Sequence, residues 1–262
     1  MKKYSVPALE KAIAILDLLA TSEDELTITE IHVQLNLPKA SVFMILNALE
    51  SYNVVTKNPS GRYSIGVKLY NLGMSYMTKM DLKKIARPHL EQLCKETGFT
   101  SHLGIMVDGK VMFVVKVEQK TSFIKFSTFE GMTSDIHISS LGKAMAAYLP
   151  EDQLDTYLQQ HGMGRYTPNT IVSPDVFKKI LPSVRATGYS IEDEEGEIGV
   201  RCIGSPIFDH EGNVIAAASI TALRSDLLLD VIPVTGEKVK RAAEAISKQL
   251  GYEQNQTNRQ YS

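Results

Sequence analysis

The sequence predicts an α+β protein built from two parts. Residues 27–63 alternate between helical and turn patterns and end in a short hairpin, which is typical of a small helical domain with one ribbon. From residue 81 onward, strand runs joined by hairpin turns are flanked by separate helices. Strands paired in hairpins beside separate helices indicate an α+β sheet domain and not a doubly wound nucleotide-binding fold.

The first helix is predicted over residues 7–20, and Pro7 suits its first turn. We expect it to support the helix pair that follows. Its apolar residues keep a helical spacing and are predicted to be its packing positions: Leu9, Ala12, Ile13, Leu16 and Leu19.

Two helices joined by a tight turn are predicted next. Thr27 and Glu30 have the spacing of a capping box, so the first helix of the pair begins at Thr27 or Thr29. Asn36 suits a left-handed helix end, and Pro38 suits the first turn of the second helix. The second helix, residues 38–50, has one apolar face that must be buried: Val42, Ile45, Leu46 and Leu49.

The opposite face of the second helix mixes polar and large apolar groups. It carries Ala40, Phe43, Met44, Asn47 and Ser51. A helix with a core face and a mixed contact face, entered from another helix through a short turn, fits the major groove of DNA. The alternative is a small helical domain that binds no nucleic acid, because helix pairs are common.

A basic hairpin follows the helix pair. Residues 54–57 and 62–65 flank the turn sequence of residues 58–61, which predicts a hairpin with Lys57 and Arg62 beside its tip. The net charge of −2 gives no basic field over the whole chain. The positions expected nearest to a duplex are nevertheless basic: Lys2, Lys3, Lys39, Lys57, Arg62 and Lys68.

A linker helix is predicted over residues 66–79. Leu69, Leu72, Tyr76 and Met77 give it an apolar stripe. A helix alone has little to bury against, so either a second chain or its own domain covers this stripe.

The second part alternates helices and strands. The Asp108-Gly109 pair between two strand runs is a strong hairpin signal, and Arg87-Pro88 predicts a kink or break in the first helix. We expect helices at 81–97, 139–149, 151–159, 173–187 and 225–250, strands at 100–107, 111–117, 122–127, 189–191, 200–208 and 214–221, and a disordered end at 253–262.

Composition excludes several classes. The 262 residues are enough for two domains, and two cysteines, Cys94 and Cys202, are too few for a disulfide framework. We find no signal peptide and no long apolar run, so we expect a cytoplasmic protein that does not associate with a membrane. We also find no phosphate-binding glycine loop and no zinc-ligand spacing, and expect no cofactor or metal.

Motifs in both halves resemble the IclR-type family of bacterial transcriptional regulators over nearly the full length. They are residues 5–12, 37–42 and 63–66 in the first half, and 131–137, 140–144, 185–189 and 194–202 in the second. The resemblance implies a winged helix-turn-helix domain at 1–65, a linker helix at 66–80, a GAF-like effector-binding domain at 81–252 and a polar tail at 253–262. It also implies binding of double-stranded operator DNA by a homodimer that pairs through its first half, with association into tetramers.

The resemblance also directs attention to the second helix of the pair. The family usually has Ser or Thr where Ala40 stands and commonly Arg where Met44 stands. Ala40 cannot bond a phosphate, and Met44 cannot read a guanine edge but, with Phe43, could contact thymine methyl groups. We therefore hypothesise an A·T-rich operator at those positions. The candidate DNA-contacting residues are Lys39, Ala40, Ser41, Phe43, Met44, Asn47, Lys57 and Arg62.

The family binds its small molecule between the sheet and the loop before the helix that begins at Ser140. The amino end of that helix favours an anion such as a carboxylate, and Ser219 and Thr221 share one face of a strand. We predict a small organic acid or polar metabolite as the effector. The matching positions are Phe126, Ser140, Leu141, Glu192, Val200, Cys202, Ser219 and Thr221.

Glu192 stands where the family often has Asp, and it opens the acidic run at residues 192–195. We expect Glu192 to face the pocket and the other three acidic residues to form a solvated turn.

Other functions remain open at this level. Cys202 and His137 could act as nucleophile and base of an enzyme, although no third orienting residue is evident. The same two residues with the acidic turn could bind a metal. A cysteine on a buried strand is more often an inert apolar side chain than a nucleophile, and we favour that interpretation of Cys202. A third possible function of the chain is that of a protein-interaction module. His102, on the first predicted strand, has no partner that the sequence identifies.

Overall fold

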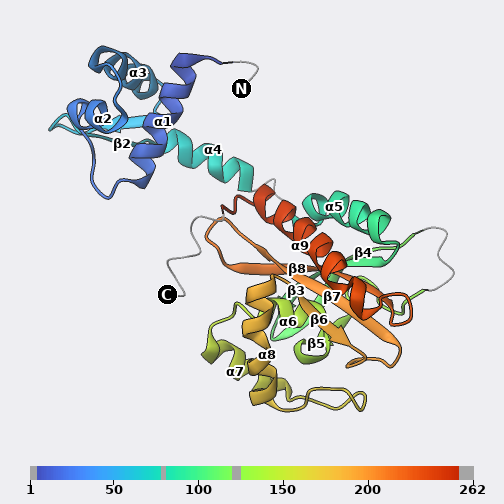
Figure 1. Cartoon of the computed structure of the whole chain (residues 1–262). Coiled ribbons are helices and arrows are strands. Elements are labelled where there is room, and N and C mark those ends of the chain that lie inside the picture. The colour runs from blue at the N-terminus through green and yellow to red at the C-terminus, as the bar shows by residue number, and fades with distance from the viewer. Residues whose placement is uncertain (1–4, 78–80, 120–124, 254–262) are drawn as a thin grey trace. The chain divides into compact units, whose positions relative to one another are not determined.

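The computed structural model describes residues 5–77, 81–119 and 125–253. The chain divides into two compact units, Met1–Met80 and Asp81–Ser262, which are described separately below (Figure 1). None of the helices in these described ranges combines the length and the apolar character needed to cross a membrane.

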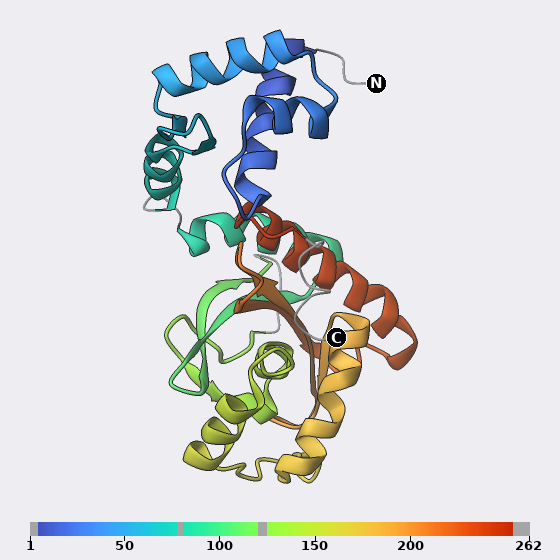
Figure 2. The same ribbon diagram turned by 90° about the vertical axis from the view of Figure 1, so that its left-hand side faces the viewer.

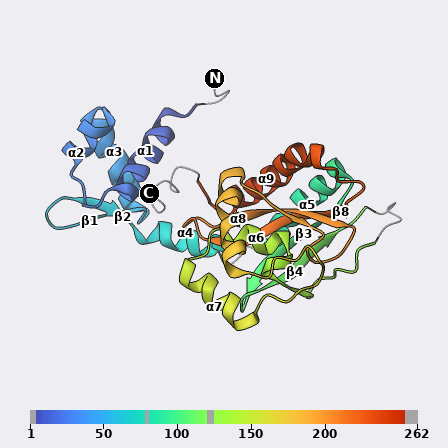
Figure 3. The same cartoon turned by 60° about the horizontal axis from the view of Figure 1, so that its bottom comes forward.

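The first unit consists of helices and one small hairpin. Figure 3 shows the hairpin extending from the helices of this unit. Its strands pair antiparallel, with Thr56 opposite Ser64. The elements are α1 (Pro7–Thr21), α2 (Ile28–Leu35), α3 (Lys39–Ser51), β1 (Val55–Lys57), β2 (Tyr63–Ile65) and α4 (Val67–Met77).

The predicted ends of α2 are confirmed, whereas Pro38, expected in the first turn of the next helix, directly precedes α3. The backbone N–H of Glu30 donates to the Thr27 hydroxyl at 3.3 Å, and the backbone N–H of Thr27 donates to the Glu30 carboxylate at 2.6 Å, which completes the capping box. Asn36 ends α2 in the left-handed conformation with a φ of 52°. The buried face of α3 is also as predicted, since Val42 and Leu46 are fully buried and Ile45 and Leu49 pack against the same core.

The predicted packing face of α1 is partly wrong. Ile15 and Leu19 are the buried residues, whereas Leu9 and Ile13 are 57% and 50% exposed. Apolar spacing shows which residues share one face of a helix. It does not show how much of the helix is covered by neighbouring elements. Within this unit, the first half of α1 therefore presents apolar side chains to solvent.

The start of α4 is held against the turn that follows α3. The backbone N–H of Gly66 donates to the carbonyl of Val54 at 2.8 Å, and that of Lys68 donates to the carbonyl of Asn53 at 3.0 Å. A Cβ atom at Gly66 would lie 2.3 Å from the Asn53 carbonyl oxygen, so only glycine permits this approach.

The second unit contains one antiparallel sheet with the strand order β5-β4-β3-β8-β7-β6. The predicted Asp108-Gly109 hairpin joins β3 to β4, and both of its turn residues have positive φ. The elements are α5 (Leu82–Thr97), β3 (Thr100–Val107), β4 (Lys110–Val117), β5 (Thr133–Asp135), η1 (Ile136–Ile138), α6 (Ser140–Ala146), α7 (Glu151–His161), α8 (Pro174–Thr187), β6 (Ser190–Asp193), β7 (Val200–Phe208), β8 (Val214–Leu223), η2 (Leu229–Val231) and α9 (Ile232–Gln249).

The sheet separates two layers of helices. α5 and α9 pack together on one face, while α6 lies on the other face with α7 and α8 beyond it (Figure 1). Figure 2 shows α6 end-on, with the sheet curling around it. Gly204 on β7 allows this close packing, because a Cβ atom there would lie 2.6 Å from the Ser140 carbonyl oxygen. The first turn of α6 is thus pressed against the centre of the sheet.

Three element predictions need correction. No strand forms at residues 125–127, and residues 122–124 lie outside the described ranges; the strand beside β4 is β5. The last helix begins at Ile232 and not at Ser225, because Pro233 fits only the first turn of a helix. α5 continues through Pro88 without a break. The predicted tail at 253–262 lies outside the described residues except for Glu253.

Candidate functional site

The outer face of α3 is open to solvent, as predicted for a DNA-contacting helix. Phe43 and Met44 are 50% and 64% exposed, although both are large apolar side chains. Lys39, Ala40 and Asn47 are exposed beside them, and Ser41 is half-buried. The packing of α3 therefore leaves these side chains available to a ligand of the first unit.

The hairpin carries its two predicted basic residues in different environments. The Lys57 ammonium lies 5.4 Å from the centre of the Tyr63 ring and is otherwise exposed. The Arg62 guanidinium is instead engaged within the unit: it lies 3.3 Å from the Glu30 carboxylate and donates to the Glu25 carbonyl at 2.7 Å. Lys57 is thus the more available of the two for a phosphate, and a phosphate contact by Arg62 stays a prediction.

Glu25 fixes the hairpin to the segment before α2. Its carboxylate accepts hydrogen bonds from the Asn58 side-chain amide and from the Ser64 hydroxyl. The hairpin is therefore joined to the segment that leads into α2. Sequence patterns gave no sign of these bonds, because the partners are more than thirty residues apart.

The second unit contains a cavity of about 250 Å³ between the sheet and the first turn of α6. It is lined by all eight residues that the family resemblance selected: Phe126, Ser140, Leu141, Glu192, Val200, Cys202, Ser219 and Thr221. Sheet register explains how distant residues meet there. Glu192 is opposite Cys202, and Cys202 is opposite Thr221, so the three side chains form a row across β6, β7 and β8.

Glu192 is the buried acid of this cavity. Only 3% of it is exposed, and its Oε1 atom accepts the backbone N–H groups of Glu195 at 2.6 Å and Gly196 at 3.0 Å. Burial raises the pKa of its carboxyl above the usual value, and the two backbone hydrogen bonds oppose that rise. The carboxyl group is therefore held in a fixed position at the cavity wall.

The other three acidic residues do not form the solvated turn that we expected. Asp193 lies 2.8 Å from the buried Arg201, Glu194 lies 3.3 Å from Arg224, and the Glu195 carboxylate lies 2.5 Å from the buried Lys143. Their partners are supplied by β7, by the segment after β8 and by α6. Arg201 lies opposite Asp193, eight residues away along the chain, whereas the pairs of Glu194 and Glu195 depend on the tertiary fold.

Cys202 is not assembled as a nucleophile. Its Sγ atom lies 3.3 Å from Thr221 Oγ1, and burial together with the nearby Glu192 raises the pKa of the thiol well above its usual value. A protonated thiol is a poor nucleophile. His137 Nε2 is instead 2.9 Å from the Gly164 carbonyl, and His137 is not among the residues that line the cavity.

Several cavity residues were missed by the sequence analysis. Phe113 comes from β4, Thr128 and Met132 from the segment before β5, and Tyr166 from the loop after α7. Tyr166 donates its hydroxyl to Asp135 at 2.7 Å, which holds that loop over the cavity. The alternation of β4 could have identified Phe113, but the loop residues carry no periodic signal. His102, which had no identified partner, lies 2.9 Å from Thr128 Oγ1.

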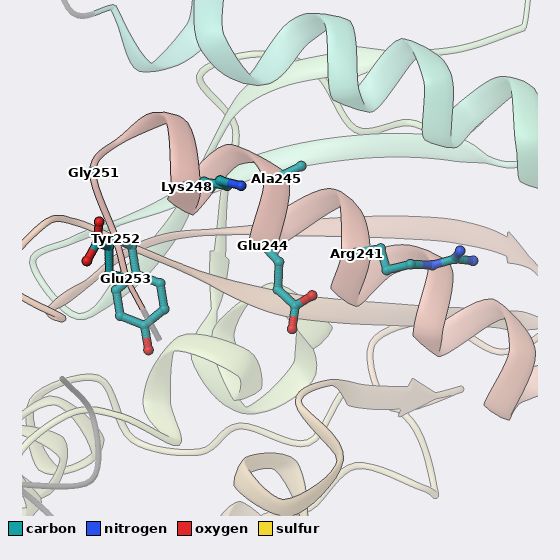
Figure 4. Close-up of a pocket in the computed structure, with 7 residues that line it drawn as sticks. All are labelled: Arg241, Glu244, Ala245, Lys248, Gly251, Tyr252 and Glu253. Atoms are coloured by element: carbon teal, nitrogen blue, oxygen red, sulfur yellow. The ribbon is translucent and has the colours of Figure 1, made fainter. Parts of the chain in front are cut away.

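Two other observations concern alternative sites. A surface pocket is lined by Arg241, Glu244 and Lys248 of α9 and by the segment that follows the helix (Figure 4). It contains none of the predicted effector residues. Across the described ranges, no three His, Cys, Asp or Glu side chains are arranged to hold a metal ion.

Comparisons with known proteins agree with this architecture. A family profile described as "IclR helix-turn-helix domain" matches residues 8–59, and one described as "Bacterial transcriptional regulator IclR C-terminal" matches residues 74–248. The chain is 32% identical to the HTH-type transcriptional regulator XynR of Escherichia coli over 94% of this chain and 98% of that protein. It is 33% identical to the HTH-type transcriptional repressor AllR of Klebsiella pneumoniae over 93% of this chain and 90% of that protein.

Solved structures show the same fold. The repressor BlcR of Agrobacterium tumefaciens matches with a TM-score of 0.81 and 27% identity, covering 95% of this chain and 99% of that chain. The IclR structure from Thermotoga maritima matches with a TM-score of 0.63 and 33% identity, covering 93% and 98%. The predicted α+β fold, with a helix-turn-helix domain before an α+β domain, is confirmed.

Proposed function

Because the chain belongs to the IclR family of bacterial transcriptional regulators, we propose that it binds operator DNA as a dimer and that a small metabolite in the second unit changes operator occupancy. Members of this family are regulators and not enzymes, so a catalytic role for Cys202 and His137 is rejected. We assign DNA binding to residues 1–65, the linker helix to 66–80 and effector binding to 81–252.

The observation that carries the DNA proposal is the exposed face of α3. Exposed apolar side chains that cluster on one helix face are one mark of a binding surface. Phe43 and Met44 lie there with Asn47, whose amide can pair with an adenine edge. This combination supports an operator that is A·T-rich where α3 contacts the bases.

Exposed apolar residues also support a dimer formed by the first unit. Leu9 and Ile13 are exposed on α1, and Val67, Tyr70 and Leu72 are 62%, 66% and 53% exposed on α4. Helices that leave such residues uncovered are typical of association surfaces. Dimers of dimers would use other surfaces, which we do not assign. AllR and BlcR are named as repressors, and we extend repression to this chain.

The cavity supports the effector part of the proposal. It joins apolar walls at Phe126, Leu141 and Val200 to polar groups at Glu192, Ser219 and Thr221, which is the composition of a small-molecule site. A ligand shifts operator occupancy only by the difference between its affinities for the DNA-bound and the free state. We propose a small organic acid or another polar metabolite as the effector.

Electrophoretic mobility shift tests this function. The full chain is titrated against fragments upstream of its own gene and the adjacent genes at low ionic strength, and then over a salt series. We expect retardation that weakens steeply with salt, because lysines that bind DNA phosphates release counterions from the DNA.

Lys39→Ala should lower the slope of log affinity against log salt by about 1. The matched control is Lys179→Ala, an exposed lysine on α8 of the second unit, which should leave the slope unchanged. Retardation of no fragment, with or without metabolites, refutes the function.

A further inference from the structure

We infer that Thr128 selects ligands of the cavity by donating a hydrogen bond to an acceptor oxygen, and that the buried His102 behind it is the positioning residue that leaves the hydroxyl hydrogen of Thr128 free to do so. This inference rests on the proposed function, because it names a specificity-determining residue of the proposed effector site. The family resemblance selected neither of the two residues.

His102 lies directly behind the wall of the cavity. It is fully buried on β3 and stands opposite Ser219 of β8, so both side chains point to the face of the sheet that carries the cavity. Its imidazole packs edge-on against the Phe113 ring, with 5.2 Å between the two ring centres. Ser219, Phe113 and Thr128 all line the cavity, whereas His102 does not. The histidine therefore acts on a ligand only through the side chains in front of it.

Thr128 is held in place before a ligand arrives. The backbone on either side of it is tied to β4, because the Lys116 ammonium donates to the Phe126 carbonyl at 2.7 Å and Gly131 donates its backbone N–H to a β4 carbonyl at 2.7 Å. The Thr128 hydroxyl oxygen lies 2.9 Å from His102 Nε2, and among the described residues the imidazole is its one hydrogen-bond partner. A group that is fixed in advance loses little freedom on binding.

The imidazole of His102 is neutral at pH 7. Burial, and secondarily the Lys116 charge, lower its pKa to about 3, so the ring has one N–H and one lone pair. Nε2 faces Thr128, whereas Nδ1 is buried and has no hydrogen-bond partner in the described ranges. Buried N–H groups without an acceptor are rarer in proteins than acceptors without a donor. The hydrogen-bond network therefore assigns the proton to Nε2, which donates it to Thr128 Oγ1.

This tautomer decides what Thr128 offers to a ligand. A hydroxyl group has one hydrogen and two lone pairs. Because the Nε2–H of His102 occupies a lone pair of Thr128 Oγ1, the hydroxyl hydrogen remains for an acceptor in the cavity. A second lining threonine, Thr221, lies 3.3 Å from Cys202 Sγ, so its hydroxyl is already shared. Thr128 thus favours a ligand with a carboxylate or carbonyl oxygen, which agrees with the effector class proposed above.

Nitrogen NMR of the full chain with ¹⁵N-labelled histidine tests the tautomer. The protonated and the unprotonated nitrogen of a neutral imidazole resonate at well-separated shifts, and His102→Gln identifies the signals of His102 among the six histidines. We expect the protonated nitrogen to be Nε2 at pH 7. A proton on Nδ1 overturns the inference, because Thr128 would then have to spend its hydrogen on the imidazole.

Probes that share a hydrocarbon body but differ in the polar head test the donor role. Butyrate and phenylacetate offer acceptor oxygens, whereas propylammonium and benzylammonium offer only donors. Each probe is titrated against the full chain by isothermal calorimetry at pH 7. Thr128→Val keeps the shape of the side chain but removes its hydroxyl, so it should weaken both acids at least about tenfold and neither amine by more than about twofold. Thr128→Ser, which keeps the hydroxyl, should restore the affinity for the acids.

His102 is tested as a positioning residue by a second set of variants, each verified as folded by a thermal melt. His102→Leu removes the donor behind Thr128 and should weaken the acids about as much as Thr128→Val does. His102→Gln places an amide N–H near the position of Nε2 and should restore their affinity to within about threefold. In the Thr128→Val background, His102→Leu should cause no further loss, since its effect passes through the hydroxyl.

The control and the contrary outcomes complete the test. Thr156→Val removes an exposed hydroxyl that is bonded to the Asp152 carbonyl on α7, and it should leave every affinity unchanged. Acids that bind Thr128→Val as tightly as the wild type, amines that are weakened as much as the acids, fully additive losses in the double variant, or no binding of either acid at about 20 mM overturn the inference. The DNA retardation experiment uses none of these probes, so the two proposals fail independently.

Discussion

His102 is a fully buried histidine on β3 whose protonation would weaken the second unit. Burial, and secondarily the Lys116 charge, lower the pKa of its imidazole to about 3 from an ordinary value of 6.5. A depressed histidine pKa stabilises the fold above pH 6.5, and this stabilisation is lost as the pH falls from 6.5 towards 3.

We therefore expect the wild type to lose about 2 kcal/mol of unfolding free energy between pH 7 and pH 5 through this one group. His102→Gln, which keeps a polar partner for Thr128, should not show this loss. Urea denaturation at both pH values, followed by circular dichroism because the chain has no tryptophan, measures the difference. Equal pH dependence in both proteins would show that the imidazole is hydrated.

Lys143 and Glu195 form a buried ion pair that is sensitive to removal of one partner. Lys143 is 1% exposed, and Glu195 is 8% exposed. Lys143→Met should cost about 3–5 kcal/mol, because it leaves the Glu195 carboxylate buried without a cation. The double variant Lys143→Met with Glu195→Leu should recover most of that loss, and chemical denaturation of both variants checks it. An equally destabilised double variant would show that shape, not charge, matters here.

Residue types and strand periodicity predicted some of the residues that line the cavity. The ion pairs around it depend on contacts between segments that are distant in the sequence. The resemblance and the two-residue period of strands brought Glu192, Cys202 and Thr221 together correctly. Local sequence could not show that Glu195 is paired with a cation, because Lys143 lies 52 residues from Glu195 along the chain. Tyr166 was missed for the same reason, since a loop residue has no periodic pattern.

α3 carries two residues, Ala40 and Met44, where the family pattern has other residue types. Met44→Arg places a guanidinium on its exposed face, where it can bond a guanine edge. We expect selected operator sequences to gain G·C pairs at the contacted position, with about 1–3 kcal/mol of new discrimination. Sequence selection with both proteins measures this. Val33→Arg, at an exposed position of α2, is the matched control and should leave the preferred bases unchanged. An unchanged preference in Met44→Arg contradicts the assigned contact.

Sequence patterns within a few residues predicted most helices and turns. They failed where the structure of a segment depends on which other element packs against it. The capping box, the Asn36 helix end and the Asp108-Gly109 turn are interactions within a few residues, so the sequence contains them completely. The strand expected at 122–127 depended on pairing with a neighbour. Residues 125–127 form no strand, and β5 pairs with residues 110–112 of β4 instead. The prediction for the first half of α1 failed for the same reason, because no element of the first unit covers Leu9 and Ile13.

At the scale of the whole molecule, the exposed apolar side chains of the first unit predict self-association. Ile13→Glu places a charge on the open face of α1 and should shift the protein from dimer to monomer, with loss of cooperative operator binding. Light scattering after gel filtration measures the mass. Val176→Glu, at a 48% exposed position of α8, is the control and should leave the mass unchanged. A dimeric Ile13→Glu variant would direct the search to other surfaces.

The tight contact at Gly66 has a mechanical consequence for the first unit. Two peptide hydrogen bonds join the beginning of α4 to Asn53 and Val54, directly after α3. The beginning of α4 is therefore joined directly to the end of α3 through the backbone. A larger residue in place of Gly66 would uncouple the two helices, and the orientation of α3 would then no longer follow that of α4.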